Sequence, residues 1–170
     1  MSKVALSIGT NCGSRVKNIE AMESALASVL QSPLKLSSLM ETSAVDVQDM
    51  QTPYLNRIIS GVFNGSPCEL LVRCEGIEKS LGRRHKGQKK PRTADIDILI
   101  CDEVIISSDK LTIPHPALLG RRFCLEGLNQ ICPDWIIPMT GKTVRENFLQ
   151  IDSVVKKQDI IFLTETTAVN

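Results

Sequence analysis

The sequence has no apolar run long enough to cross a bilayer, although 42% of its residues are hydrophobic. Its amino terminus, MSKVALSIGTN, lacks the long apolar stretch and the small-residue cleavage site of a signal peptide. These two absences predict a cytoplasmic protein without a membrane partner.

An excess of one charge is also missing. The sequence carries 20 Lys and Arg against 19 Asp and Glu, a formal net charge of +1, which gives no general attraction to nucleic acid or to membrane surfaces. The 170 residues are enough for one domain with a hydrophobic core and too few for two. We expect a single domain over residues 1–163, followed by a frayed tail at residues 164–170.

The cysteines include no CxxC pair, which argues against a zinc site of the usual spacing. Most of them fall within apolar segments, where a free thiol behaves as a small hydrophobe. We expect buried free thiols, and a zinc site is the alternative. The six cysteines are Cys12, Cys68, Cys74, Cys101, Cys124 and Cys132.

The first half of the chain has the periodicity of a strand, a helix and two further extended segments. Apolar and polar residues alternate over residues 4–8, which predicts a strand. Apolar residues then recur at helical spacing from residue 14 until the Ser-Pro step at residues 32–33, which predicts a helix that ends there. Residues 34–47 and 54–63 are rich in β-branched and apolar side chains and predict extended structure.

The second half continues with helix and strand signals. Residues 66–69 combine a capping serine, a proline at the first helical position and a glutamate that completes a capping box. Gly82 is placed to end this second helix in a left-handed conformation. Isoleucines at alternate positions over residues 96–100 predict a strand, and a turn then leads to a short partner strand at residues 104–106.

The remaining elements complete a recognisable order. Apolar positions between Phe123 and Ile131 predict a third helix that ends before Pro133. A second capping box at Thr143 predicts a short helix, and residues 160–163 predict a last strand. The order strand, helix, strand, strand, helix, strand indicates an α+β fold of the ferredoxin-like split βαβ type, an antiparallel sheet with helices packed on it.

Two carboxylates form the strongest local signal for chemistry. Asp95 and Asp97 are two residues apart in a predicted strand, so both project from one face. Two like charges this close are unfavourable unless a cation lies between them, and hard oxygen ligands suit magnesium when phosphates complete its shell. The alternative for a bare D-x-D pattern is the polar face of an ordinary sheet. The upstream Arg92 and the basic loop before it favour the metal site.

The segment RRHKGQKKPR, residues 83–92, concentrates cations next to these carboxylates. Arginine forks match phosphate oxygens, and a loop without apolar anchors is expected to be mobile and to fold over a bound polyphosphate. Solvated loop charge is the alternative. His115 is held between two prolines, which suits a side chain directed at a ligand or a simple bond to a neighbouring carbonyl. Arg121 lies near a helix start, where anions are favoured.

Aromatic residues are scarce, at one Tyr, one Trp and four Phe. Tyr54 and Asn56 are two apart in a predicted strand and therefore face the same side. The pair suits a flat heterocycle, because the ring can stack on Tyr54 while the Asn56 amide reads its donor and acceptor edge. Phe123 is a candidate for the other face of that heterocycle. Core packing is the alternative for both aromatic residues.

Four ordered segments together resemble the 6-hydroxymethyl-7,8-dihydropterin pyrophosphokinase family, from about residue 5 to about residue 138. The segments are ALSIGTNCGSR, QTPYLN, IEKSLGRRHKGQKKPRTADIDIL and LTIPHPALLGRRFCLEGLNQICPD. Family members usually carry a tryptophan before the Pro-Arg step, where this chain has Gln88-Lys89-Lys90. The resemblance implies an ATP-dependent diphosphotransferase of folate synthesis with a ferredoxin-like αββα core, two magnesium ions and ATP as co-substrate.

The resemblance also implies roles for individual residues. Asp95 and Asp97 would bind the metal ions, and Arg83 and Arg92 would act on the ATP phosphates as catalytic residues. The nucleotide side of the site would further include Glu78, Ile98, Leu111, His115 and Arg121. The pterin would be held by Thr42, Val45, Tyr54, Asn56 and Phe123.

Two functions of other classes stay open. A ferredoxin-like sheet with exposed aromatic residues and a basic loop could bind RNA, although the aromatic motif of RNA-recognition sheets is missing. A nucleotidyltransferase also places two metals on an Asp-x-Asp strand. For the pyrophosphokinase we expect a monomer that binds ATP and hydroxymethyldihydropterin, with no nucleic-acid partner.

Overall fold

The chain folds into strands and helices in the computed structural model, which describes residues 1–43, 52–83 and 91–164. No helix in these ranges is both long and apolar enough to span a bilayer. The elements are β1 (Ser2–Thr10), α1 (Arg15–Ala27), β2 (Gln31–Leu36), β3 (Leu39–Thr42), β4 (Tyr54–Phe63), α2 (Pro67–Ser80), β5 (Asp95–Cys101), β6 (Ile106–Ser107), β7 (Thr112–Ile113), α3 (Arg122–Ile131), β8 (Ile136–Ile137), β9 (Lys142–Thr143), α4 (Val144–Leu149), α5 (Ser153–Lys156) and β10 (Ile160–Leu163).

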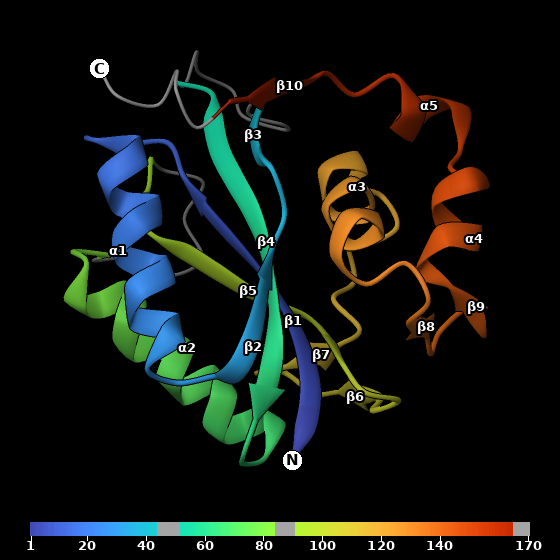
Figure 1. The fold of residues 1–170 in the computed structure, drawn as a ribbon, viewed down its shortest axis with the longest axis horizontal. Coiled ribbons are helices and arrows are strands. Elements are labelled where there is room, and N and C mark those ends of the chain that lie inside the picture. The colour runs from blue at the N-terminus through green and yellow to red at the C-terminus, as the bar shows by residue number, and fades with distance from the viewer. Residues whose placement is uncertain (44–51, 84–90, 165–170) are drawn as a thin grey trace.

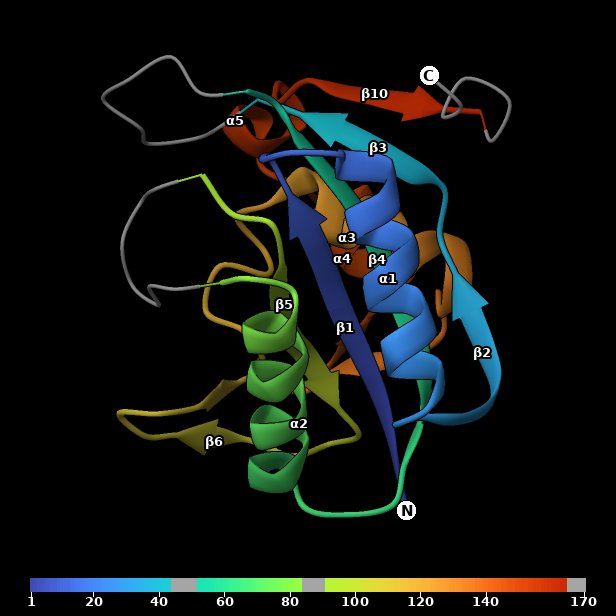
Figure 2. The ribbon, with the colours of Figure 1, turned by 90° about the vertical axis from the view of Figure 1, so that its left-hand side faces the viewer.

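One antiparallel sheet organises the described chain. Its strand order is β10-β3-β4-β1-β5, and β2 also pairs with β4. Helices α1 and α2 cover one face of the sheet and α3 covers the other (Figure 1, Figure 2). Because β1 lies between β4 and β5 and pairs antiparallel with both, the arrangement is that of a ferredoxin-like split βαβ unit. The α+β fold predicted from the sequence is confirmed.

Side-chain alternation along β1 separates two hydrophobic cores. Leu6 and Ile8 are fully buried against α1 and α2, whereas Ala5 is fully buried in the core under α3. Each fully buried Leu or Ile stabilises the fold by roughly 1.5–3 kcal/mol. The same alternation directs Ser7 and Gly9 to the α3 side of the sheet, where the core gives way to a cavity.

Most of the local start and stop signals are confirmed. The Ser66 hydroxyl accepts the Glu69 N–H, the Glu69 carboxylate accepts the Ser66 N–H, and the same capping box occurs at Thr143. Gly82 follows α2 with a φ of +90°, a left-handed conformation that glycine adopts without steric cost. The predicted last strand is present as β10.

The end of the first helix was predicted too late. Helix α1 ends at Ala27, and the Ser-Pro step at residues 32–33 lies inside β2. Pairing with β4 already begins at Gln31, so tertiary contact draws the chain out of the helix before the proline. The extended segment predicted at residues 34–47 is also divided, because Ser37 leaves the strand path and its hydroxyl accepts the Ile58 N–H. Residues 44–47 lie outside the described ranges.

Two further predictions need correction. The short strand after β5 is at Ile106–Ser107 and pairs with β7 rather than with β5. Cys68 is exposed and Cys12 is partly exposed, whereas the other four cysteines are buried as free thiols. Burial raises the pKa of Cys124 and of Cys132 to about 12, so these thiols stay protonated and unreactive at neutral pH. Residues 165–170, most of the predicted tail, lie outside the described ranges.

Candidate active site

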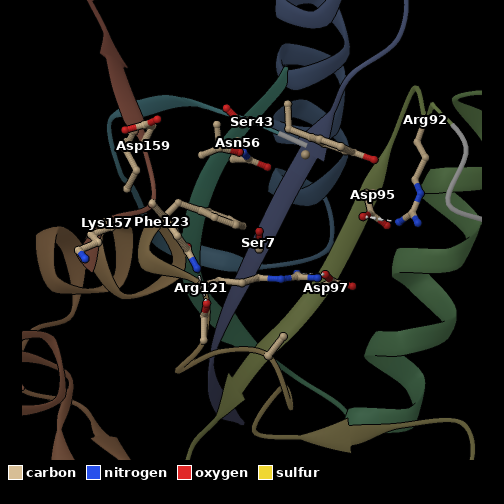
Figure 3. Close-up of a pocket in the computed structure, with 17 residues that line it drawn as sticks. Ser7, Ser43, Asn56, Arg92, Asp95, Asp97, Arg121, Phe123, Lys157 and Asp159 are labelled. Carbon is tan, nitrogen blue, oxygen red and sulfur yellow. Dashed lines mark hydrogen bonds and ion pairs between the residues drawn. The ribbon is translucent and has the colours of Figure 1, made fainter. Parts of the chain in front are cut away.

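A cavity of about 540 Å³ lies between the sheet and α3 (Figure 3). This volume is in the usual range for small-molecule sites. Many of the residues predicted from distant parts of the sequence meet there. They are Thr42, Tyr54, Asn56, Arg92, Asp95, Asp97, Arg121 and Phe123.

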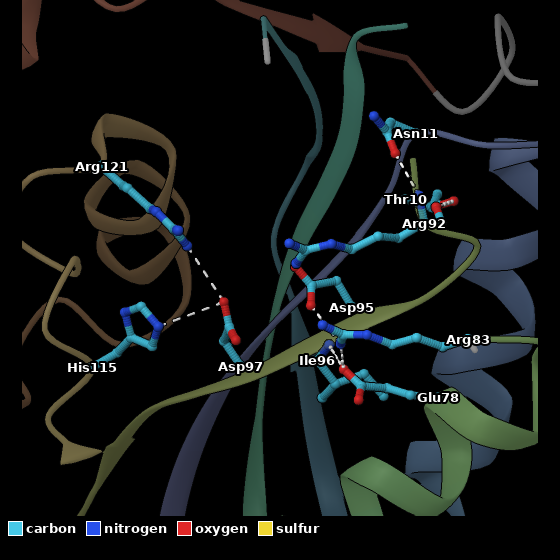
Figure 4. Close-up of polar contacts among 10 residues, drawn as sticks. All are labelled: Thr10, Asn11, Glu78, Arg83, Arg92, Asp95, Ile96, Asp97, His115 and Arg121. Atoms are coloured by element: carbon cyan, nitrogen blue, oxygen red, sulfur yellow. Dashed lines mark hydrogen bonds and ion pairs between the residues drawn. The ribbon is translucent and has the colours of Figure 1, made fainter. Parts of the chain in front are cut away.

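Asp95 is held by two arginines at one end of the cavity (Figure 4). Arg83 Nη1 donates to Asp95 Oδ1 at 2.6 Å, and Arg92 Nη1 donates to Asp95 Oδ2 at 2.7 Å. Burial raises the pKa of Asp95 and the charge of Asp97 raises it further, while the two arginines oppose this rise. Two carboxylates this close and partly buried are unfavourable in their charged forms, so nearby cations are needed to stabilise them.

Glu78 of α2 supports this arrangement from below. Its carboxylate is buried, with 4% of the side chain exposed, and Oε1 accepts the Ile96 backbone N–H at 2.7 Å. The same oxygen accepts a hydrogen bond from Arg83 Nη1. One carboxylate thus fixes both the arginine and the strand that carries Asp95 and Asp97.

Asp97 faces a second pair of basic groups. Arg121 Nη1 lies 3.3 Å from Asp97 Oδ2, and His115 Nε2 lies 3.6 Å from the same oxygen. His115 Nδ1 accepts the Ala117 N–H at 3.1 Å, which places the ring proton on Nε2. Burial lowers the pKa of His115 more than Asp97 raises it, so the ring is neutral at pH 7. It can donate one hydrogen bond toward an anion in the cavity.

The donor set can be tested against a magnesium ion. Within residues 1–43, 52–83 and 91–164, no group of three or more His, Cys, Asp or Glu side chains is arranged to hold a metal. Asp95 and Asp97 therefore offer hard oxygen donors that need further oxygens, such as those of a phosphate chain, to complete a shell. Each Asp95 oxygen accepts one bond from arginine and keeps a second lone pair, so a metal ion could bind this carboxylate beside the arginines.

The backbone of Arg92 is fixed by the turn after β1. The Arg92 N–H donates to Asn11 Oδ1 at 2.8 Å, and the Arg92 carbonyl accepts the Asn11 N–H at 3.0 Å. The Thr10 hydroxyl donates to the same carbonyl at 3.1 Å. These contacts fix the backbone from which the Arg92 side chain reaches Asp95.

A ring site occupies the other end of the cavity. Asn56 is buried, and its Nδ2 donates to the Thr42 hydroxyl at 2.9 Å, which fixes the orientation of the amide. Tyr54 lines the cavity from β4 and Phe123 lines it from α3. Burial raises the pKa of Tyr54, so its hydroxyl stays protonated at neutral pH. The aromatic rings and the amide match the needs of a flat heterocycle.

Arg15 fixes the ring site from the opposite face of the sheet. It is the first residue of α1, and its Nη1 bonds Glu41 Oε2 at 2.7 Å and the Pro53 carbonyl at 2.8 Å. These two partners flank the Thr42–Tyr54 strand pair, the last pair of β3 with β4. Arg15 thus clamps the strand ends that present Thr42 and Tyr54 to the cavity.

Some predicted site residues lie elsewhere. The side chains of Ile98 and Leu111 are buried in the core under α1 and α2, and neither lines the cavity. His115, Arg83 and Glu78 stand next to the carboxylates without lining the cavity wall. Val45 and residues 84–90 of the basic loop lie outside the described ranges.

Other cavity residues were missed by the sequence reasoning. Ser7 and Gly9 line the floor, and their alternation with Leu6 and Ile8 could have revealed their direction. Residues 157–160 form a wall with no local motif. They are held by tertiary contacts, because Gln158 Nε2 donates to the Gly120 carbonyl at 2.8 Å and its Oε1 accepts the Arg122 N–H at 2.9 Å.

Comparison with known proteins identifies the family. Residues 5–133 match the family model described as 7,8-dihydro-6-hydroxymethylpterin-pyrophosphokinase (HPPK). The chain belongs to the HPPK family. The 2-amino-4-hydroxy-6-hydroxymethyldihydropteridine pyrophosphokinase of Aquifex aeolicus is 32% identical over 86% of this chain and 90% of that protein. The enzyme of the same name from Bacillus subtilis is 35% identical over 78% of this chain and 80% of that protein.

Longer proteins contain a related segment. The folic acid synthesis protein fol1 of Pneumocystis carinii is 36% identical over 87% of this chain, which spans only 20% of the length of that protein. A crystal structure of Plasmodium falciparum HPPK-DHPS with pteroate has a TM-score of 0.70 at 14% identity, covering 96% of this chain and 48% of that chain. The structural likeness supports the fold of the HPPK family member described here.

Proposed function

We propose that residues 1–163 form one domain that transfers the terminal diphosphate of ATP to the hydroxymethyl group of 6-hydroxymethyl-7,8-dihydropterin. The products are AMP and the pterin diphosphate. The observation that carries the proposal is that one cavity contains both a ring site, with Tyr54, Asn56 and Phe123, and a cluster of carboxylates and arginines. Family membership agrees with this assignment.

On the acceptor side, the pterin ring lies between Tyr54 and Phe123. Asn56, oriented by Thr42, bonds the polar edge of the ring, and backbone groups of Thr42 and Val45 complete that edge. Helix α3 covers this face of the sheet (Figure 1). Tyr54 and Phe123 line the cavity between the sheet and α3. This geometry favours a small heterocycle over the stacked bases of a polynucleotide.

On the donor side, Asp95 and Asp97 hold two magnesium ions together with phosphate oxygens. Bound magnesium supplies positive charge to the phosphate chain and to the oxygens that attack and leave. Arg83 and Arg92 contact the phosphates, and Glu78 orients Arg83. His115 and Arg121 donate to phosphate from the far side of Asp97, and backbone groups near Ile98 and Leu111 accommodate the adenine.

The cavity favours direct transfer to the acceptor. Both Asp95 oxygens accept bonds from arginines, Asp97 accepts one from Arg121, and neutral His115 is arranged as a donor rather than as a phosphate acceptor. The hydroxymethyl oxygen therefore attacks the β-phosphorus in line, and the bond from this phosphorus to the oxygen that bridges it to the α-phosphorus breaks. AMP leaves with that oxygen, and the hydroxyl proton passes to solvent. Arg83 and Arg92 stabilise the charge that develops on the transferring group.

The proposed reaction also concerns the partners, location and oligomeric state of the protein. Both substrates are small molecules, and neither a nucleic acid nor a membrane takes part in the proposed reaction. We further propose a cytoplasmic monomer in which both substrates bind in the same cavity.

The products of one incubation test the proposal. Protein, ATP, magnesium and 6-hydroxymethyl-7,8-dihydropterin are mixed, and the products are followed by phosphorus NMR. AMP and pterin diphosphate in equal amounts are expected. ADP with pterin monophosphate would indicate an ordinary kinase, and inorganic diphosphate with an adenylylated product would indicate a nucleotidyltransferase. Either result, or no pterin-dependent AMP, would overturn the proposal.

A further inference from the structure

The floor of the cavity is formed by β4, β1 and β5, and the pairing of these strands determines which side chains are neighbours there. Gly9 of β1 stands opposite Asn56 of β4 and opposite Asp95 of β5. Ser7, the neighbouring position of β1 on the same face, stands opposite Asp97. Positions two apart on a strand are separated by ~7 Å, so Ser7 lies one such step from the ring site and directly beside a carboxylate.

Gly9 leaves free space between the two ends of the cavity, because it has no side chain. A Cβ atom at Gly9 would lie 2.8 Å from Asn56 Oδ1 and 3.8 Å from Tyr54 Cδ1. Since glycine has no side chain, a flat ring beside Tyr54 and Asn56 can extend over β1 toward the carboxylates. The next side chain of β1 on this face is Ser7, which Figure 3 shows between Phe123 and Asp97.

The Ser7 hydroxyl is available to form a hydrogen bond with a ligand. Its residue is 5% exposed and lines the cavity. In the described parts of the chain its hydroxyl takes part in no hydrogen bond, and it lines the cavity, where a ligand can reach it. A hydroxyl has one donor and two acceptor positions, so a ligand oxygen or O–H group above Ser7 would satisfy it.

We propose that Ser7 contacts the reacting group of the acceptor, with a hydrogen bond between its hydroxyl and the hydroxymethyl oxygen of the pterin. The inference rests on the proposed function, which supplies the acceptor. The ring lies over Gly9, its hydroxymethyl substituent points along β1, and Ser7 holds the oxygen on the side where Asp97 and the phosphates meet. Ser7 thereby distinguishes a hydroxymethyl substituent from one without a hydroxyl.

A pair of ligands that differ by one hydroxyl tests this contact. Binding of 6-hydroxymethyl-7,8-dihydropterin and of 6-methyl-7,8-dihydropterin is measured by calorimetry with magnesium and a nonhydrolysable ATP analogue. Ser7→Ala is expected to weaken the hydroxymethyl ligand by about threefold to tenfold, as for one lost hydrogen bond, and to leave the methyl ligand within about twofold. Ser7→Thr keeps the hydroxyl and is expected to retain the preference of the wild type.

Matched measurements separate the outcomes. Ser60→Ala removes another buried serine hydroxyl, from β4 and away from the cavity lining, and is expected to leave both affinities unchanged. Equal weakening of both ligands by Ser7→Ala, or no weakening of either, would overturn the contact while wild-type AMP formation still upheld the proposed function. A wild-type protein that bound neither pterin would overturn both.

Discussion

The contribution of the Glu78 hydrogen bonds to the stability of the protein can be measured by unfolding. Two substitutions separate its contacts. Glu78→Gln keeps an acceptor for the Ile96 N–H but removes the charge that faces Arg83. Glu78→Leu has a similar size and removes both contacts.

The structure sets the expected cost of each change. The Arg83 side chain is 9% exposed, and Asp95, 2.6 Å away, is a second carboxylate partner that the substitution does not remove. The cost of Glu78→Gln should therefore stay below the ~3–5 kcal/mol of a fully broken buried pair, at about 1–3 kcal/mol. Glu78→Leu also leaves the buried Ile96 N–H without its acceptor, which adds about 1–3 kcal/mol. For a chain of this size, each 1 kcal/mol lowers Tm by roughly 2–4 °C.

Urea unfolding followed by fluorescence provides the assay. Trp135 is the single tryptophan and packs against the core under α3, away from Glu78. Glu20→Gln changes an exposed carboxylate of α1 and should alter stability by less than about 0.5 kcal/mol. If Glu78→Leu were no less stable than Glu78→Gln, the bond to Ile96 would contribute nothing. If both matched the wild type, the support assigned to Glu78 would be wrong.

Three further predictions concern activity and binding. Asp97→Asn should lower AMP formation at least about 100-fold with an unchanged circular dichroism spectrum, and activity near that of the wild type would contradict its metal-binding role. Tyr54→Ala should weaken pterin binding by ~1–3 kcal/mol in calorimetry while ATP-analogue binding stays constant; equal loss for both ligands would point to a mistaken pocket. Arg15→Met should weaken pterin binding by up to about fivefold, because it releases the clamp on the ring site. Its control, Glu23→Gln, removes the charge of a different α1 ion pair, the one to Arg57 of β4 at 2.8 Å, and should leave pterin affinity unchanged, so equal effects would exclude the clamp.

Features governed by local sequence were predictable. The capping box at Ser66 depends on residues three apart, and the shared face of Asp95 and Asp97 depends only on strand periodicity. The ferredoxin-like topology then follows from the order of the elements, because few arrangements bury their apolar faces. Together these signals located the carboxylate cluster and the ring site.

Features governed by distant contacts were not predictable. The end of α1 is decided by pairing of Gln31 with Val62, which lies far along the chain. The cavity wall at residues 157–160 depends on hydrogen bonds between Gln158 and the backbone of Gly120 and Arg122. No sequence pattern within the segment predicts these bonds. Ser7 was overlooked for another reason, since a lone serine in an apolar strand carries no motif.

The pairing of β10 with β3 has a consequence for the making of the protein. Strand β3 leaves the ribosome early, whereas its partner Ile160–Leu163 comes near the end of the described chain. At a synthesis rate of about 5–20 residues per second, the edge of β3 stays unpaired for on the order of 10 s before β10 is made. During that time its backbone groups are open to mispairing with other nascent chains. Truncation before residue 160 would make this vulnerable interval permanent and would reduce the yield of folded protein before any effect on turnover could be measured.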